Sequence, residues 1–220
     1  MGWSPPQSTN DYADAQIRWF LSALLSPVIV EIGMFDGTDT RKLLSWCTSK
    51  PAYYGFEADP RNIKNIKDRY VDHLINFFPA AVGCVTGKVP FYMSSAQENG
   101  VAGSSSLSEF TPNITKHWPW LHCQGIETVD CWRLDDFCRN FGIDHIDLLW
   151  MDVQGAERLV VEGACQMLDH TRMVWTEYDD GTLYKDSICR DDLLCLFKGW
   201  EVVADVGDNV LLKSPGVRIG

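Results

Sequence analysis

A glycine-containing segment near the amino terminus has the composition of a ligand-binding turn. Residues 31–38 read Glu-Ile-Gly-Met-Phe-Asp-Gly-Thr and overlap the end of an apolar, β-branched run at 28–32. Gly33 and Gly37 allow a tight turn, and the helix expected next offers free N–H groups to an anion. A dinucleotide pyrophosphate loop would need glycine where Phe35 and Thr38 stand. The segment therefore disfavours NAD and favours a smaller charged group at this point, although a plain strand-to-helix turn is the alternative interpretation.

An acidic residue follows the next apolar run at the right distance to take part in the same site. Glu57 ends the run at 52–56 and lies 20 residues after Gly37. A carboxylate at the tip of this strand can accept hydrogen bonds from both ribose hydroxyls of an adenosine ligand. The alternative is a solvated charge at a strand end. The glycine turn and the acid together predict a nucleoside-binding crevice.

A third segment, residues 148–157, ends an apolar strand at Asp152 and leads through Gly155 into a helix. In an open α/β sheet, ligands bind beyond the carboxyl ends of the strands, so Asp152 is expected at the same crevice as Glu57. A helix N-cap is the alternative role for Asp152. Glu177 follows a later apolar run and is expected at the same edge.

These side chains need a scaffold that brings distant strand ends together, and the hydrophobic pattern predicts one. The expected strands are 28–32, 52–56, 74–82, 146–151, 172–176, 200–205 and 209–213, and the expected helices are 11–25, 38–47, 60–70, 134–141, 156–168 and 190–198. Alternation of strands and helices indicates a mostly parallel sheet covered on both faces. We expect one α/β domain, a Rossmann-like seven-stranded sheet over residues 1–220, with a leading helix in 1–27 and a closing antiparallel hairpin.

Residues 84–125 interrupt this alternation. Apart from a short expected strand at 89–93, the stretch is rich in glycine and serine and then carries aromatic residues, so it is interpreted as an inserted loop or lid. His117 and Trp118 within it could supply a base and a stacking platform for an acceptor, and Tyr178 could line the acceptor side. A covering role for the tryptophan and a surface role for the histidine are the plainer alternatives.

The ordered series of segments resembles the FkbM-type class I methyltransferases over roughly residues 28 to 178. The matching segments are Gly33–Thr38, Gly55–Pro60, Ala80–Gly83, Ser104–Leu107, Leu134–Phe137, Asp147–Glu157, Glu162–Ala164 and Glu177. Two positions depart from the family pattern: Trp150 stands where many members carry lysine, and Gln154 where many carry glutamate. The resemblance therefore assigns no catalytic role to these two positions.

The resemblance implies a Rossmann-like class I methyltransferase fold and methyl transfer from S-adenosylmethionine, usually to an oxygen. The expected cofactor-binding residues are Glu31, Gly33, Phe35, Asp36, Gly37, Thr38, Glu57, Ala58, Ala81, Asp152 and Val153. The expected catalytic residues are Asp152 and Glu177, as general base or as positioning groups. The expected acceptor-side residues are Ser105, Ser106, His117, Trp118 and Tyr178.

Composition limits the class of methyl acceptor and the cellular location that we expect. The net charge is −11 and 45% of residues are hydrophobic. A nucleic-acid binder usually has a basic stripe, so a small-molecule or glycan hydroxyl is the preferred acceptor. No metal is expected, since no histidine is suitably spaced beside the carboxylates. The chain has neither a membrane-length apolar run nor an apolar signal segment, which favours a cytoplasmic protein. An RNA 2′-O-methyltransferase and a degenerate scaffold domain stay as alternatives.

Overall fold

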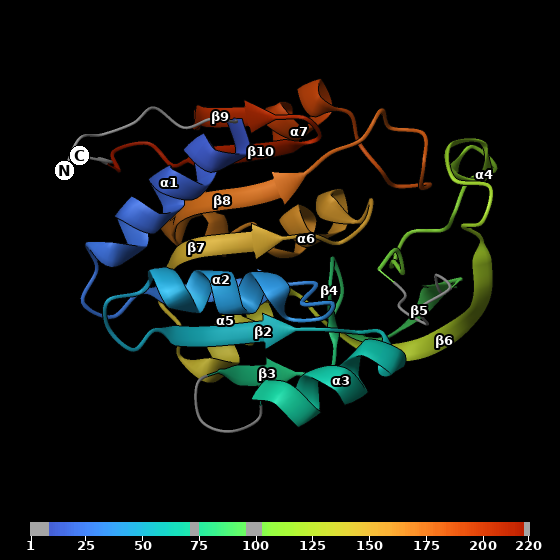
Figure 1. Cartoon of the computed structure of the whole chain (residues 1–220), viewed down its shortest axis with the longest axis horizontal. Coiled ribbons are helices and arrows are strands. Elements are labelled where there is room, and N and C mark those ends of the chain that lie inside the picture. The colour runs from blue at the N-terminus through green and yellow to red at the C-terminus, as the bar shows by residue number, and fades with distance from the viewer. Residues whose placement is uncertain (1–8, 71–74, 96–102, 218–220) are drawn as a thin grey trace.

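A seven-stranded sheet forms the middle layer of the molecule. The computed structural model describes residues 9–70, 75–95 and 103–217. The strands are β1 (Val28–Ile32), β2 (Ala52–Phe56), β3 (Asn76–Phe78), β7 (Ile146–Met151), β8 (Thr171–Glu177), β9 (Glu201–Val206) and β10 (Asn209–Lys213). Their order is β3-β2-β1-β7-β8-β10-β9, and β10 runs antiparallel to both neighbours. This confirms the predicted fold class (Figure 1).

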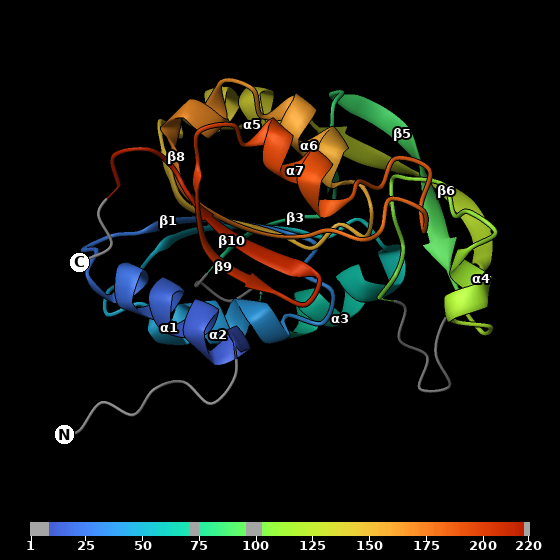
Figure 2. The ribbon, with the colours of Figure 1, turned by 90° about the horizontal axis from the view of Figure 1, so that it is seen from above.

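Helices cover both faces of this sheet, as Figure 2 shows from above. One layer holds α1 (Thr9–Ser22), α2 (Thr38–Trp46) and α3 (Pro60–Tyr70), and the other holds α5 (Leu134–Phe141), α6 (Glu157–Gly163) and α7 (Arg190–Leu196). Every residue of the central strand β7 is buried, because it is covered on both faces. Among the helices of the described residues, none is both long and apolar enough to span a membrane.

A second, three-stranded sheet lies beyond the carboxyl ends of the main strands (Figure 1). Its order is β4 (Ala81–Val82), β6 (Cys123–Trp132) and β5 (Gly87–Ser94), and a short helix α4 (Ile114–His117) adjoins it. The single strand expected at 74–82 is therefore divided between the two sheets. Strand β6 was not predicted, because its first six residues are exposed and lack an apolar period. The smaller sheet thus takes up the two ends of the stretch interpreted as an inserted loop, at 87–94 and 123–125.

The helix expected at 156–168 also divides in two. Helix α6 ends at Gly163, where a Cβ atom would lie 2.0 Å from the carbonyl oxygen of Gly83. A 3-10 helix, Met167–His170, follows. The buried carboxylate of Asp135 accepts hydrogen bonds from the N–H groups of Gln166 and Met167, at 3.1 and 2.9 Å. This contact from α5 starts the second helix, so a distant residue sets a boundary that local sequence does not show.

Candidate functional site

The tips of β1, β2 and β7 meet at one edge of the sheet and enclose a cavity of about 310 Å³. This volume is at the lower end of the range for small-molecule sites. Of the predicted cofactor residues, seven line the cavity: Gly33, Phe35, Glu57, Ala58, Ala81, Asp152 and Val153. Phe56, Phe91 and Leu107 give it an apolar floor and wall, while Glu57 and Asn62 add polar groups.

Gly33 holds the site together through strand packing. Its φ angle is +88°, and a Cβ atom there would lie 1.9 Å from the backbone oxygen of Asp152. The N–H of Asp152 donates to the carbonyl oxygen of Ile32 at 3.0 Å. The sequence explained this glycine by a tight turn, and the structure shows that the close approach of the Asp152 backbone also requires it.

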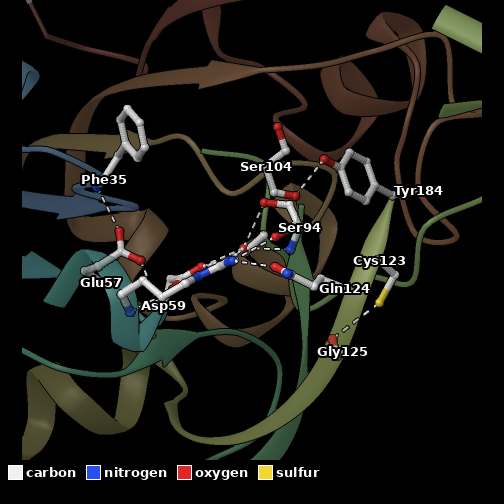
Figure 3. A network of polar contacts seen from close by, with 11 residues as sticks. Phe35, Glu57, Asp59, Ser94, Ser104, Cys123, Gln124, Gly125 and Tyr184 are labelled. Atoms are coloured by element: carbon white, nitrogen blue, oxygen red, sulfur yellow. Dashed lines mark hydrogen bonds and ion pairs between the residues drawn. The ribbon is translucent and has the colours of Figure 1, made fainter. Parts of the chain in front are cut away.

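Glu57 organises the polar end of the cavity. Its Oε2 accepts a hydrogen bond from the N–H of Phe35 and its Oε1 one from the N–H of Asp59, both at 2.8 Å (Figure 3). The side chain is only 6% exposed, and burial raises its pKa to about 7. Phe35 has a φ angle of +51°, which is rare for a residue with a side chain. The side chain of Asn62 also hydrogen-bonds to it, and because a carboxylate offers about four acceptor positions, Glu57 keeps capacity for a donor that enters the cavity.

Four residues of the predicted cofactor set lie outside the lining of this cavity. Glu31 is fully buried under α2, where its Oε2 accepts hydrogen bonds from Thr40 at 2.6 Å and from Tyr53 at 2.5 Å. Desolvation raises the pKa of Glu31 to about 8. The alternation of side chains along β1 explains this, since Ile32 lines the cavity and its neighbour Glu31 points to the opposite face of the sheet.

The remaining three, Asp36, Gly37 and Thr38, form the turn into α2. Gly37 is the N-cap residue with φ +76°, and the N–H of Thr38 donates to Oδ1 of Asp36 at 2.9 Å. The carboxylate of Asp36 therefore already serves one of the free N–H groups that the sequence offered to an anion. A direct cofactor contact by these three residues stays a prediction.

A second cavity, of about 330 Å³, adjoins the first. Ser104 and Gln154 line both cavities. Of the predicted acceptor-side residues, Trp118 and Tyr178 line the second cavity, and Ser105 lines the first. The two cavities stand beside each other at the carboxyl ends of β7 and β8, so a ligand in one would abut a ligand in the other.

Two predicted acceptor-side residues line neither cavity. The hydroxyl of Ser106 is buried and donates to the carbonyl oxygen of Val153 at 3.3 Å. His117 is exposed, and its ring lies against Trp118 with 5.7 Å between ring centres. Tyr178 turns its hydroxyl away from the cavity, toward Asp205 at 2.7 Å. An acceptor contact by Ser106 or His117 stays a prediction.

The two predicted catalytic carboxylates are joined by a residue that the sequence left without a role. Nε2 of Gln154 donates to Oδ1 of Asp152 at 2.7 Å and to Oε2 of Glu177 at 3.2 Å. Gln154 has a φ angle of +54°, which indicates a backbone held by its surroundings. Burial raises the pKa of both carboxyls, and the charge of Asp152 raises the pKa of Glu177 further. Both carboxyls therefore keep a proton to higher pH than an exposed carboxyl does.

Tyr184 is a further site residue that the sequence did not indicate. Its ring packs on Gly155, where a Cβ atom would lie 2.5 Å from the ring. Its hydroxyl donates to the carbonyl oxygen of Ser104 at 3.0 Å (Figure 3). Tyr184 thus closes the second cavity from the loop after β8. No spacing rule connects it to the predicted motifs, so only the fold reveals it.

Arg61 ties the start of α3 to the smaller sheet. Its guanidinium donates to both carboxylate oxygens of Asp59, to the carbonyl oxygen of Ser94 at 2.9 Å and to Oγ of Ser105 at 3.1 Å. It also reaches Oε1 of Gln124 at 3.2 Å (Figure 3). Although burial opposes it, hydrogen bonds from Arg61 and Ser105 hold the pKa of Asp59 below its usual value. The inserted segment is thereby fixed next to Glu57.

The sheet order and the position of the crevice define a Rossmann-like class I methyltransferase fold. Two solved structures share it: methyltransferase FkbM from Methylobacillus flagellatus KT, with a TM-score of 0.55 and 16% identity, and an rRNA methylase from Streptococcus thermophilus, with 0.52 and 11%. The matches cover 94% and 96% of this chain and 50% and 99% of those chains. The chain thus spans half the length of the solved FkbM protein, and these likenesses show the fold.

Sequence comparison gives the family. The FkbM methyltransferase domain matches residues 31–190, and the chain belongs to this family. It is also similar to the 2-O-methyltransferase NoeI of Sinorhizobium fredii (strain NBRC 101917 / NGR234), with 34% identity over 195 residues that cover 86% of this chain and 79% of that protein. Within the described residues, no three His, Cys, Asp or Glu side chains are grouped to hold a metal ion.

Proposed function

We propose that this protein transfers a methyl group from S-adenosylmethionine to a hydroxyl group on a small molecule or glycan. The observation that carries the proposal is the pair of adjoining cavities, which meet at Gln154 beside two carboxylates. The name of its relative, a 2-O-methyltransferase, supports an oxygen acceptor.

The first cavity fits the cofactor by its chemistry. Glu57 faces it with acceptor capacity for a ribose hydroxyl, and Phe56, Ala81 and Phe91 offer an apolar wall for a flat base. When bound, S-adenosylmethionine supplies an electrophilic methyl group. The cavity residues bind and orient it, and alignment alone can supply much of the rate acceleration in such a displacement.

Asp152 and Glu177 are proposed to receive the proton that the acceptor hydroxyl loses. They lie on either side of Gln154, one at each cavity, so a hydroxyl between the cavities can reach a carboxylate. Gln154 holds both side chains in place through its two N–H groups. A general base accelerates proton transfer best when its pKa lies near the operating pH. Burial raises the pKa of both carboxyls above the usual carboxylate range.

A nucleic-acid acceptor is disfavoured by charge. The chain carries 30 acidic residues against 19 basic ones, and four carboxylates, but no lysine, arginine or histidine, are among the residues that line the second cavity. A phosphate backbone would be repelled at this surface. The similarity to an rRNA methylase shows a shared fold and does not indicate which acceptor this chain methylates.

Calorimetric titration with S-adenosylmethionine tests the proposal. Wild-type protein should bind it, and Glu57→Ala should lose about 1–3 kcal/mol of binding free energy, the scale of hydrogen bonds to a charged group. Glu162→Gln, an exposed position on α6, is the matched control and should bind normally. NAD should give no heat. Absence of binding by folded wild-type protein, or an unchanged affinity of Glu57→Ala, would contradict the proposal.

A further inference from the structure

The second cavity has an unusually acidic lining. Glu157, Glu177, Asp179 and Asp208 line it, and among the described lining residues there is no lysine, arginine or histidine to balance them. Acidic residues alone do not define a site, so the argument depends on what else faces the cavity.

Glu157 is nearly fully enclosed and keeps hydrogen-bond acceptor capacity. Its side chain is 2% exposed, and its Oε1 accepts one weak hydrogen bond from the N–H of Gly155 at 3.3 Å. The N–H of Glu157 itself also donates to this carboxyl group. Glu157 lines the cavity, and a carboxylate offers about four acceptor positions, of which these two N–H groups use two. A carboxylate in this position is ready to accept a hydrogen bond from a ligand.

Two tryptophans line the same cavity and stay partly open to solvent. Trp118 is 42% exposed and Trp120 46%, although large aromatic side chains are usually well buried. The face of an indole ring attracts an ammonium group, and it also packs against the C–H faces of a saturated ring. Carboxylates and indole faces around one cavity are therefore complementary to a hydroxylated ring that carries a positive charge.

We propose that the second cavity is the acceptor site and that it selects a hydroxylated acceptor bearing a protonated amino group, such as an amino sugar, over neutral and acidic analogues. The inference rests on the proposed function and extends it to the class of acceptor. The ammonium group would donate to Glu157 and Glu177, and the ring would lie on Trp118 or Trp120. The hydroxyl to be methylated would then lie at the boundary marked by Gln154.

Ligand-observed NMR titrations with three matched sugars test the charge preference. Glucosamine, N-acetylglucosamine and glucose differ at one carbon, and only the first carries a cation. Each is titrated into the protein with and without S-adenosylhomocysteine. Glucosamine should bind about tenfold more tightly than the other two, the scale of one hydrogen bond to a charged group. Equal affinities of the three sugars would overturn the inference.

Variants locate the preference in the cavity. Glu157→Gln and Glu177→Gln, made singly, should each reduce the preference at least threefold, and Glu162→Gln on the same helix as Glu157 should leave it unchanged. If Glu162→Gln reduces the glucosamine preference as much as the two cavity variants do, the preference results from the overall charge of the protein and the inference is contradicted. Calorimetric titration with Mg²⁺ alone is a third experiment. Strong Mg²⁺ binding that Glu157→Gln abolishes would assign the cavity to a metal ion and overturn the inference of an amine.

Failure of this inference is distinguishable from failure of the proposed function. S-adenosylhomocysteine binding reports on the first cavity, and the sugar series reports on the second. Normal S-adenosylhomocysteine binding without an amine preference would overturn the acceptor class alone. Loss of S-adenosylhomocysteine binding with the amine preference kept would contradict methyl transfer but leave an amine-selective cavity.

Discussion

The α-carbon of Gly33 lies so close to the backbone of Asp152 that a Cβ atom would come within 1.9 Å of its carbonyl oxygen. Two segments separated by more than a hundred residues are thereby held in contact at the edge of the first cavity. We expect Gly33→Ala to lower the free energy of unfolding by about 2–4 kcal/mol, from backbone strain plus separation of the strand tips.

Urea denaturation measures this effect, and Gly142→Ala is its matched control. Gly142 also has a positive φ angle, +67°, but a Cβ atom there would meet open space. The free energy of unfolding of the control should fall by only about 1 kcal/mol, the cost of backbone strain alone. Equal losses in the two variants would show that the contact with Asp152 adds nothing.

Glu31 should make the protein more stable at mildly acid pH than at alkaline pH. Burial raises its pKa from 4.5 to about 8, so between these values the folded chain holds a proton that the unfolded chain releases. The free energy of unfolding therefore falls as pH rises through this window. Glu57 and Glu157, with pKa values raised by burial to about 7 and 8, act in the same direction.

Replacing Glu31 with glutamine isolates the contribution of Glu31 to the pH dependence of stability. The amide oxygen can still accept hydrogen bonds from Thr40 and Tyr53, but the side chain no longer titrates. The loss of stability between pH 5.5 and pH 8.5 should shrink by about 1–3 kcal/mol, because one pKa unit corresponds to about 1.4 kcal/mol. Thermal unfolding over this pH range measures it. An unchanged pH profile would mean that Glu31 is ionised throughout.

Arg61 should stabilise the fold through a buried partner. The Asp59 side chain is almost fully buried, and Arg61→Ala would leave it without its cation. We expect a loss of about 2 kcal/mol in urea denaturation, less than for a fully buried pair because Arg61 is partly exposed. The double variant Asp59→Asn, Arg61→Ala should recover part of this loss. If it is no more stable than Arg61→Ala, the ion pair is not the cause.

Methyl transfer should increase with pH across the neutral range. Asp152 and Glu177 must be deprotonated to take the acceptor proton, and burial raises the pKa of both, so the acid limb of the rate profile should lie above the usual carboxylate range. The initial rate with any accepted hydroxyl compound, measured from pH 5 to 9, tests this. Glu177→Gln should lower the rate and shift the acid limb of the profile. An acid limb near pH 4 in the wild type would exclude Asp152 and Glu177 as the groups that take the acceptor proton.

Local sequence was sufficient for the main sheet and for half of the site. Strands β1, β2, β7 and β10 begin and end where the apolar pattern predicts, because they are buried runs with clear polar ends. Glu57 and Asp152 follow such strands directly, so their positions could be inferred from the parallel arrangement alone.

The rest of the site depends on contacts that no local pattern carries. Strand β6 is mostly exposed and pairs with β5 along its length, so its sequence lacks a buried period. Tyr184 reaches the site through Gly155, and Gln154 acquires its position from Asp152 and Glu177. Glu31 lies outside the lining of the cavity because strand alternation turns it toward Tyr53. These outcomes follow from tertiary packing.

Ser104 and Gln154 form part of both cavities, and this shared wall has a thermodynamic consequence. Any ligand that fixes these two side chains in one cavity changes the free energy of filling the other. The binding of cofactor and acceptor is therefore expected to be linked, with each altering the affinity of the other by the same factor. Order of addition would then affect how fast the ternary complex forms, while its final population would be the same by either route.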